Sequence, residues 1–306
     1  MTDILEDGGA RTILFGGSGF LGPYILERCP NMISVGRNPP PTKNRHIQVP
    51  SLDDLRKLDD VDFDRVIYII GNTDHHSLEK DRLDIGEPSA FDYHVTPLVH
   101  TLEQIKHRPI RKFIHFSSML VYDPERVPDP VGEDAPIAPY RNRYVLSKYL
   151  AEEVSKFYER WIPIITCRFC NLYGPTPLER YDLIHVMARK LLADGKAEAW
   201  SGKPQRDFIY VTDAADAILK LLDSDFTGLV NLGTGELTSV GRVLEILQEV
   251  SGCPIQILDQ PVDGPMCFRS DTTRLKSAIK WEPAVTIEKG VREVWEKTRF
   301  WWEDRE

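Results

Sequence analysis

The chain has 306 residues, of which 42% are hydrophobic and 28% are charged, a composition typical of soluble globular proteins. Its formal net charge of −9 argues against nucleic acid as a partner, because phosphate backbones bind basic surfaces. No apolar run reaches the roughly 18 residues that a membrane-spanning helix needs. The acidic, polar start, Met1–Ala10, does not suggest a signal peptide. We therefore expect no nucleic-acid or membrane partner.

The five cysteines are too sparse for a disulfide framework, which favours a reducing, cytoplasmic location. Cys167 and Cys170 form a CxxC motif within an apolar run. No second ligand pair with zinc spacing accompanies it, so we expect these cysteines to be structural and predict no metal site.

In the first half of the chain, short apolar runs alternate with segments of helical period. Strands are predicted at Arg11–Phe15, Met32–Val35, Arg65–Ile70, Lys112–Phe116 and Ile164–Phe169, and helices at Val95–Ile105 and Tyr144–Trp161. Strands that alternate with helices form a parallel sheet with helices on both faces. The predicted fold class is therefore α/β, with a doubly wound parallel sheet of the Rossmann type.

After Gly174 the pattern loosens. Helices are predicted at Tyr181–Ala193, Ala214–Leu222, Val240–Val250 and Trp295–Trp302, and strands at Phe208–Val211 and Val230–Gly235. We expect a dinucleotide-binding domain over residues 1–170 that also receives about 206–233. A smaller, discontinuous C-terminal substrate lobe would then comprise 171–205 and 234–306.

A glycine-rich turn follows the first predicted strand directly. It consists of Gly16, Gly17, Ser18, Gly19, Phe20, Leu21 and Gly22, and residues 17–22 fit the pattern GxGxxG. The first glycine of that pattern permits a tight turn, the second lets a pyrophosphate approach the backbone, and the third lets helix pack on strand. The following helix N-terminus favours negative charge. These residues are therefore predicted to bind a dinucleotide.

The second predicted strand is followed by Gly36 and Arg37, and Arg37 lies twenty residues after Gly17. At this place NAD-binding proteins carry an acidic residue for the ribose 2′-hydroxyl. An arginine can instead pair with a 2′-phosphate through charge-assisted hydrogen bonds. The sequence favours NADP(H) as the cofactor, with NAD(H) as the alternative.

Candidate catalytic groups follow the fourth predicted strand. Ser118 comes just after Lys112–Phe116, and Tyr144 and Lys148 form a YxxxK motif. Residues i and i+4 of a helix share a face. A tyrosine pKa is ordinarily about 10, and a neighbouring lysine cation and an oxidised nicotinamide both lower it. Tyr144 can then exchange a proton with a substrate oxygen during hydride transfer, while Ser118 donates a hydrogen bond to that oxygen.

With these motifs the chain resembles the NAD-dependent epimerase/dehydratase family of extended short-chain dehydrogenases, which mostly modify nucleotide sugars. The resemblance runs from about Thr12 to Trp302 and includes GGSGFLG, SSMLVY, YVLSK, CRFCNLYGP, RDFIYVTD, NLGTGE and KWEP in the family order. It implies catalytic roles for Ser118, Tyr144 and Lys148, with Lys148 also at the cofactor. It further implies that Asn171 contacts the substrate, that Arg206 contacts a nucleoside diphosphate, and that the protein is a homodimer.

Two departures from the family pattern matter. Met119 and Leu120 stand where the dehydratases carry Asp-Glu, so elimination of water is not expected. His94 precedes Val95 where the family has Asn-Val, and His94 is either a substrate-site residue or only a polar group of the helix.

The leading hypothesis is a nucleotide-sugar oxidoreductase that reduces a keto-sugar carbonyl. Arg37 favours NADP(H), the usual biosynthetic reductant, and the bulk of Met119 and Leu120 leaves little room for a keto-sugar to turn over. One alternative is an NAD-dependent nucleotide-sugar 4-epimerase with the same three catalytic residues. Another is a non-catalytic cofactor-sensing or scaffold protein, against which the intact Ser–Tyr–Lys set counts.

Overall fold

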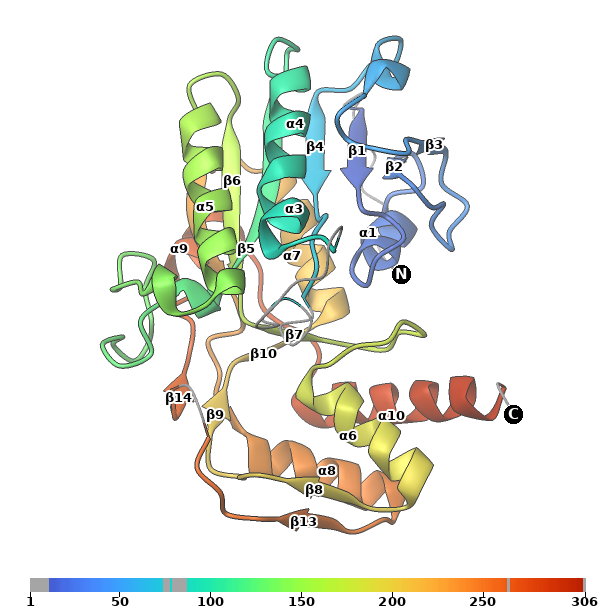
Figure 1. Ribbon diagram of the computed structural model, residues 1–306, viewed down its shortest axis with the longest axis vertical. Helices are drawn as coiled ribbons and strands as arrows, with labels where there is room; N and C mark the ends of the chain where they lie inside the picture. Colours follow the sequence, from blue (N-terminus) through green and yellow to red (C-terminus); the bar gives the residue numbers. More distant parts are fainter. Residues whose placement is uncertain (1–10, 74–77, 79–86, 263–264, 305–306) are drawn as a thin grey trace. The chain divides into compact units, whose positions relative to one another are not determined.

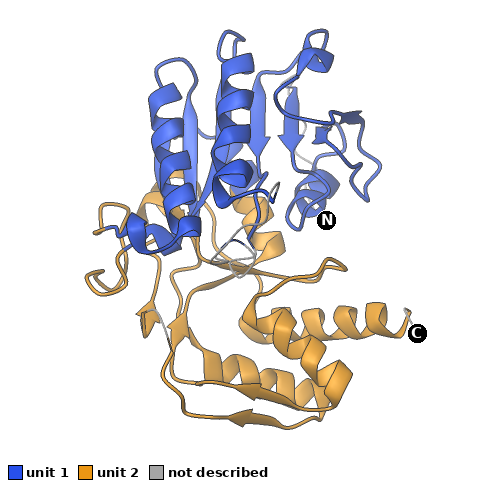
Figure 2. Cartoon of the chain, in the orientation of Figure 1, with its two compact units in different colours: residues 1–122, 137–168, 218–230 blue, residues 123–136, 169–217, 231–306 orange. Residues whose placement is uncertain are grey.

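The computed structural model describes residues 11–73, 78, 87–262 and 265–304 (Figure 1). Met1–Ala10, which we interpreted from sequence as unlike a signal peptide, lies outside this range. The chain forms two compact units: unit 1, of residues 1–122, 137–168 and 218–230, and unit 2, of 123–136, 169–217 and 231–306 (Figure 2). The division expected from sequence instead kept 123–136, 169–170, about 206–217 and 231–233 with the first domain.

A seven-stranded sheet forms the centre of unit 1. Its strands are β1 (Thr12–Phe15), β2 (Ile33–Gly36), β3 (His46–Gln48), β4 (Arg65–Tyr68), β5 (Lys112–Ser118), β6 (Ile164–Phe169) and β11 (Gly228–Leu232), in the order β11-β6-β5-β4-β1-β2-β3. The pairs β1–β2, β2–β3, β1–β4 and β4–β5 are parallel. The chain adds β2 and β3 on one side of β1 and then adds β4, β5 and β6 on the other side. This is the strand order of a Rossmann sheet, and it confirms the predicted fold class.

Helices flank the sheet. They are α1 (Gly22–Arg28), α3 (Ala90–His94), α4 (Thr96–Ile105), α5 (Arg143–Tyr158) and α7 (Val211–Asp223), with 3-10 turns η1 (Arg56–Leu58), η2 (Met119–Val121) and η3 (Pro139–Arg141). In Figure 1, α4 and α5 stand side by side against one face of the sheet. Leu102 of α4 and Ala151 of α5 belong to the same buried core as Phe113 of β5. This packing fixes α5, with its YxxxK motif, against the sheet.

Unit 2 contains short strands and longer helices. The elements are β7 (Asn171–Tyr173), α6 (Leu183–Asp194), β8 (Ala197–Ala199), β9 (Gln205–Arg206), β10 (Phe208–Tyr210), β12 (Thr238–Ser239), α8 (Val240–Ser251), β13 (Ile255–Ile257), β14 (Cys267–Phe268), α9 (Thr273–Ala278) and α10 (Ile287–Glu303). The predicted helix Trp295–Trp302 is only the second half of α10. The helix begins after the N-cap Thr286, whose hydroxyl accepts a hydrogen bond from Lys289 N.

Three further observations on the described part of the chain concern membrane helices, metal ligands and thiols. No helix there is long and apolar enough to cross a membrane. No group of three or more His, Cys, Asp or Glu within it is arranged to hold a metal ion. The five cysteines are all free thiols, and Cys167 is buried in β6.

A buried ion pair connects α5 to β6 in unit 1. Arg168 is 4% exposed and Glu152 is 8% exposed. The guanidinium donates from Nε to Glu152 Oε1 at 2.9 Å and from a terminal nitrogen to Oε2 at 2.7 Å. It also lies 4.5 Å from the centre of the Tyr122 ring. This two-bond geometry compensates the cost of removing both charges from water.

Replacing Arg168 with methionine should leave the Glu152 carboxylate buried without its partner. We expect the free energy of unfolding, measured by urea denaturation, to fall by roughly 3–5 kcal/mol. The double variant Glu152→Leu/Arg168→Met removes both charges and should recover most of the loss. A single variant as stable as wild type would contradict this account of the pair.

Candidate active site

The glycine-rich turn connects β1 to α1, and either backbone conformation or close packing requires glycine at three of its positions. Gly16 has a φ of +94°, which favours glycine. A Cβ on Gly17 would lie 2.4 Å from Ser34 Oγ, and one on Gly22 would lie 2.6 Å from the backbone of Gly17. These close approaches bring strand, turn and helix together in the way that dinucleotide-binding turns require.

Gly19 differs from the other three glycines. A Cβ there would have only Gly16 O within 4 Å, at 3.3 Å, so internal packing alone does not explain this glycine. Open space beside its backbone is what a pyrophosphate needs in order to approach. Ser18, Phe20 and Leu21 complete the turn, and Leu21 is the N-cap residue of α1. The turn therefore fits a dinucleotide.

Arg37 directly follows β2, at the edge of the sheet where β3 pairs. Its side chain is exposed, and its carbonyl accepts a hydrogen bond from Gln48 Nε2 at 3.0 Å. The backbone is thus fixed by β3, while the guanidinium is left to solvent. Lys43 and Arg45, in the segment that leads into β3, are also exposed cations.

Ser118 is the last residue of β5, which extends two residues beyond the strand predicted from sequence. Its hydroxyl oxygen accepts a hydrogen bond from Leu120 N at 3.2 Å and caps η2. This bond does not use the hydroxyl proton, which is left to donate. Of the two bulky residues that follow, Met119 is 3% exposed and Leu120 is 41% exposed.

Tyr144 and Lys148 lie one turn apart on the buried face of α5, with exposures of 4% and 7%. Lys148 Nζ lies 6.0 Å from the centre of the Tyr144 ring and donates a hydrogen bond to Phe116 O at 3.1 Å. Because Phe116 lies two residues before Ser118 on β5, this bond ties the YxxxK face of the helix to the end of the strand. Tyr144 also packs in one cluster with Val121 of η2.

Burial strongly affects the titration of this site. Burial lowers the pKa of Lys148 to about 8, with the Glu152 carboxylate opposing the shift. Burial and then the Lys148 cation lower the pKa of His115, the residue before Phe116, to about 3. His115 is therefore neutral at physiological pH, and Lys148 supplies the positive charge beside Tyr144. A cation so placed favours a tyrosinate.

His94 packs against Tyr144. The two rings meet edge to face with centroids 5.5 Å apart. The His94 ring nitrogens lie 2.8 Å from Ser147 Oγ and 2.9 Å from Asn72 O. Ser147 Oγ in turn donates to Tyr144 O at 2.8 Å. His94 is 2% exposed, and these contacts place it behind the tyrosine, where it fixes the orientation of the ring.

The remaining two predicted residues, Asn171 and Arg206, line a cavity of about 380 Å³ within unit 2. The buried carboxylate of Asp207 organises this wall, because it accepts hydrogen bonds from Thr234 N and Gly235 N at 2.9 and 3.0 Å. Asn171 Nδ2 donates to Asp207 O at 2.9 Å. Burial lowers the pKa of Arg206, as expected for a cation that has lost water. An anionic ligand would compensate that loss.

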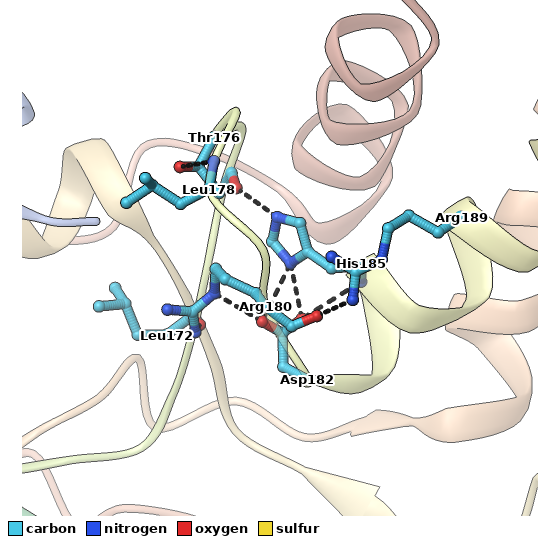
Figure 3. Close-up of polar contacts among 8 residues, drawn as sticks. Leu172, Thr176, Leu178, Arg180, Asp182, His185 and Arg189 are labelled. Carbon is cyan, nitrogen blue, oxygen red and sulfur yellow. Dashed lines mark hydrogen bonds and ion pairs between the residues drawn. The ribbon is translucent and has the colours of Figure 1, made fainter. Parts of the chain in front are cut away.

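A polar cluster in unit 2 holds the segment between β7 and α6 (Figure 3). Asp182 caps α6, and His185 Nδ1 lies 2.8 Å from Asp182 Oδ1. The other ring nitrogen of His185 lies 3.0 Å from Gly174 O, and Arg180 Nε donates to Asp182 Oδ2 at 2.7 Å. Burial alone would raise the pKa of Asp182, but His185 and Arg180 lower it. Asp182 itself lines the cavity, so the cluster fixes one side of it.

Several of these residues were not predicted from the sequence. Glu152 lies one turn after Lys148, and the i, i+4 spacing predicts that the two side chains are neighbours on one helix face. Asp182 directly precedes an apolar helical run, which is an N-cap signal, and His185 follows it by three residues. Glu198 and Trp200, which also line the cavity, carry no such signal.

The chain matches known proteins over most of its length. The model of the NAD dependent epimerase/dehydratase family matches residues 12–233. A putative UDP-glucose 4-epimerase of Methanocaldococcus jannaschii is 28% identical, over 92% of this chain and 96% of that protein. GDP-mannose 3,5-epimerase 1 of Oryza sativa subsp. indica is 27% identical, over 95% and 81%. The structure of TunA, an NAD dependent NDP-hexosamine 5,6-dehydratase, superposes with a TM-score of 0.82 at 26% identity, over 97% and 99%.

The lowered pKa of Lys148 predicts a pH-dependent stability. Between about 8, in the folded protein, and 10.5, its ordinary value, the unfolded chain binds more protons at this lysine. The free energy of unfolding of wild type relative to Lys148→Met should therefore rise with pH across this window, by at most about 1.4 kcal/mol per pH unit. Urea denaturation at several pH values measures it. A difference that is constant with pH would show that this pKa is not lowered.

Proposed function

Because the chain belongs to the NAD-dependent epimerase/dehydratase family, we propose that it transfers a hydride between a nicotinamide dinucleotide and a carbon of a nucleoside-diphosphate sugar. The observation that carries this proposal is the buried Tyr144–Lys148 face, which a hydrogen bond from Lys148 ties to the end of β5 beside Ser118. The cofactor, when bound, supplies or accepts the hydride. The turn from Gly16 to Gly22 would hold its pyrophosphate.

The protein's own residues would handle the proton and the substrate oxygen. In the direction of reduction, the Tyr144 hydroxyl donates its proton to the carbonyl oxygen, and Ser118 donates a hydrogen bond to the same atom. Lys148 stabilises the resulting tyrosinate by its charge. His94 acts behind the tyrosine as a positioning residue. In the oxidation direction the same groups act in reverse.

For the net reaction, the leading candidate is reduction of a keto-sugar carbonyl. Arg37 favours it, because an exposed arginine stands after β2 where an acidic residue would select NAD(H). The expected cofactor is then NADP(H). NAD(H) has support from the similarity to TunA, an NAD dependent dehydratase.

The second candidate is 4-epimerisation of a nucleotide sugar. The similarity to the putative UDP-glucose 4-epimerase, along 92% of this chain, favours it. In an epimerase the hydride returns to the same sugar, so the cofactor stays bound and is not consumed. Nucleotide analysis of the purified protein separates the two candidates: co-purified NAD supports epimerisation, and a site that takes up NADPH from solution supports reduction.

The catalytic assignment is tested by substitutions at the three residues. Tyr144→Phe keeps the ring but removes the proton, so turnover should fall by roughly 10²- to 10⁴-fold with little change in cofactor affinity. Ser118→Ala should behave similarly, whereas Lys148→Met should weaken both turnover and cofactor binding. The readout is NADPH consumption with a panel of keto-sugar nucleotides, alongside cofactor titrations.

Tyr140→Phe is the matched control, because it makes the same chemical change at a residue that is 83% exposed. If Tyr144→Phe turns over as fast as wild type, the catalytic assignment is wrong. If wild type binds cofactor but neither consumes NADPH with any keto-sugar nucleotide nor epimerises any nucleotide sugar, the cofactor-sensing or scaffold hypothesis replaces the enzyme.

Arg37→Asp should shift the cofactor preference towards NAD(H). The substitution removes a partner of the 2′-phosphate and adds a like charge, so the ratio of the two dissociation constants should change by roughly ten- to hundredfold. Arg37→Lys keeps the charge and should shift the ratio less. An unchanged ratio in Arg37→Asp would refute the role of Arg37 in NADP(H) binding.

We also expect a homodimer built on α4 and α5. Phe157, in the last turn of α5, is 49% exposed, and Trp161, three residues after the helix, is 42% exposed; Arg160 lies over both rings. Sedimentation at micromolar concentration should show a dimer that Phe157→Asp converts to monomer. Phe300→Asp, on α10, is the control at another exposed ring, which is 61% exposed. A wild-type monomer would contradict the expectation.

The five free thiols suit the cytoplasmic location that we propose.

A further inference from the structure

The cavity of unit 2 has one wall formed by β8 and the residue that follows it. Glu198 and Trp200 both line the cavity, and Trp200 is 61% exposed. They lie two residues apart, a spacing that places side chains on the same side of an extended chain. The wall therefore offers a flat aromatic ring and a carboxylate to whatever occupies the cavity.

β8 also has backbone polar groups that its sheet leaves unpaired. β8 pairs with β13 in a two-stranded sheet, so one of its edges is unpaired in that sheet. Ala197 N donates to Pro254 O at 3.1 Å, and Leu258 N donates to Ala199 O at 2.9 Å. Because successive peptide groups point to opposite edges of a strand, the N–H and C=O of Glu198 point to the unpaired edge.

The carboxylate of Glu198 can accept hydrogen bonds from a molecule in the cavity. Asp182, the other acid in the cavity wall, is already held by His185 and Arg180. Within the ranges that the structure describes, Glu198 forms no ion pair, although Lys190 and Arg206 line the same cavity. Glu198 thus combines two carboxylate oxygens with a peptide N–H donor on one residue.

We propose that this wall selects guanine, so that the nucleotide bound in the cavity is a guanosine diphosphate group. This inference rests on the proposed function. Guanine presents two adjacent donors, N1–H and the N2 amino group, to a carboxylate, and its neighbouring O6 accepts from an N–H. Uracil and thymine present one N–H between two carbonyl oxygens, which a carboxylate repels. Adenine and cytosine place a ring-nitrogen acceptor beside their amino group.

Trp200 serves a different purpose in this arrangement. Every base has a face on which an aromatic ring can stack, so stacking adds affinity without selecting a base. Arg206, on the same cavity, suits the diphosphate through its charge. Selection among nucleotides then falls to Glu198, while Trp200 and Arg206 strengthen the binding of all of them.

The test measures dissociation constants of the full-length protein for GDP, IDP and UDP by titration calorimetry. IDP keeps O6 and N1–H but lacks the N2 amino group, so it isolates the second hydrogen bond to the carboxylate. We expect GDP to bind roughly ten- to hundredfold more tightly than UDP, and roughly tenfold more tightly than IDP. Glu198→Gln should remove most of both preferences. Glu296→Gln, an exposed carboxylate on α10, should change neither. Trp200→Leu should weaken all three ligands alike.

The outcomes separate this inference from the function on which it rests. If UDP binds as tightly as GDP, or if Glu198→Gln leaves the GDP-to-IDP ratio unchanged, the guanine assignment is wrong and the proposed function stands. If none of the three nucleotides binds while the cofactor does, both the guanine assignment and the nucleoside-diphosphate substrate are wrong. Cofactor binding by each variant shows that it is folded.

Discussion

The chemistry proposed for unit 1 depends on one buried cation. Lys148 has lost its water, yet its ammonium is held by the Phe116 carbonyl at 3.1 Å and lies near the Glu152 carboxylate. Burial favours the neutral amine of Lys148, and the Glu152 carboxylate partly offsets this because it favours the ammonium form. Glu152 is in turn bound by two hydrogen bonds from Arg168. The positive charge that favours a Tyr144 phenolate therefore depends on a chain of buried ionic contacts that runs along α5 to β6.

Such a chain demands a rigid sheet, and the sequence of unit 1 provides one. β4 and β5 pair in parallel register, with Val66 opposite Phe113, and both side chains belong to the buried core on which α4 and α5 pack. Because β5 ends at Ser118, the strand and helix bring the serine, tyrosine and lysine to one end of the sheet. Catalytic groups on strand ends and helix faces are held more precisely than groups on loops.

Much of unit 1 could be predicted from the sequence, because its strands are continuous, mostly buried runs and its turn is marked by glycines. β3, with three half-buried or exposed residues, gave no such signal. The helix Trp295–Trp302 was predicted too short. In the first half of α10 the core-facing residues include Gly290, which has no side chain, and Val291, which stands among charged neighbours, so the apolar period is weak there. Of the candidate site residues, Ser118, Tyr144 and Lys148 lie where the motifs suggested. The buried contacts of His94 with Tyr144 and Ser147 could not be inferred, because they join segments 50 residues or more apart in the chain.

The elements of unit 2 were harder to predict from the sequence, for a physical reason. Its strands have two or three residues, too few for an alternating pattern, and their positions depend on side-chain hydrogen bonds rather than on apolar periodicity. Asp207 fixes the turn at Thr234 and Gly235, and the Asp182–His185 pair fixes the segment before α6. β8 instead pairs with β13 through its backbone, and Glu198 is exposed on it, so we expect a change of this side chain to leave the fold intact. Differences in what the cavity binds can therefore arise in unit 2 while the buried Tyr144–Lys148 face of α5 remains the same.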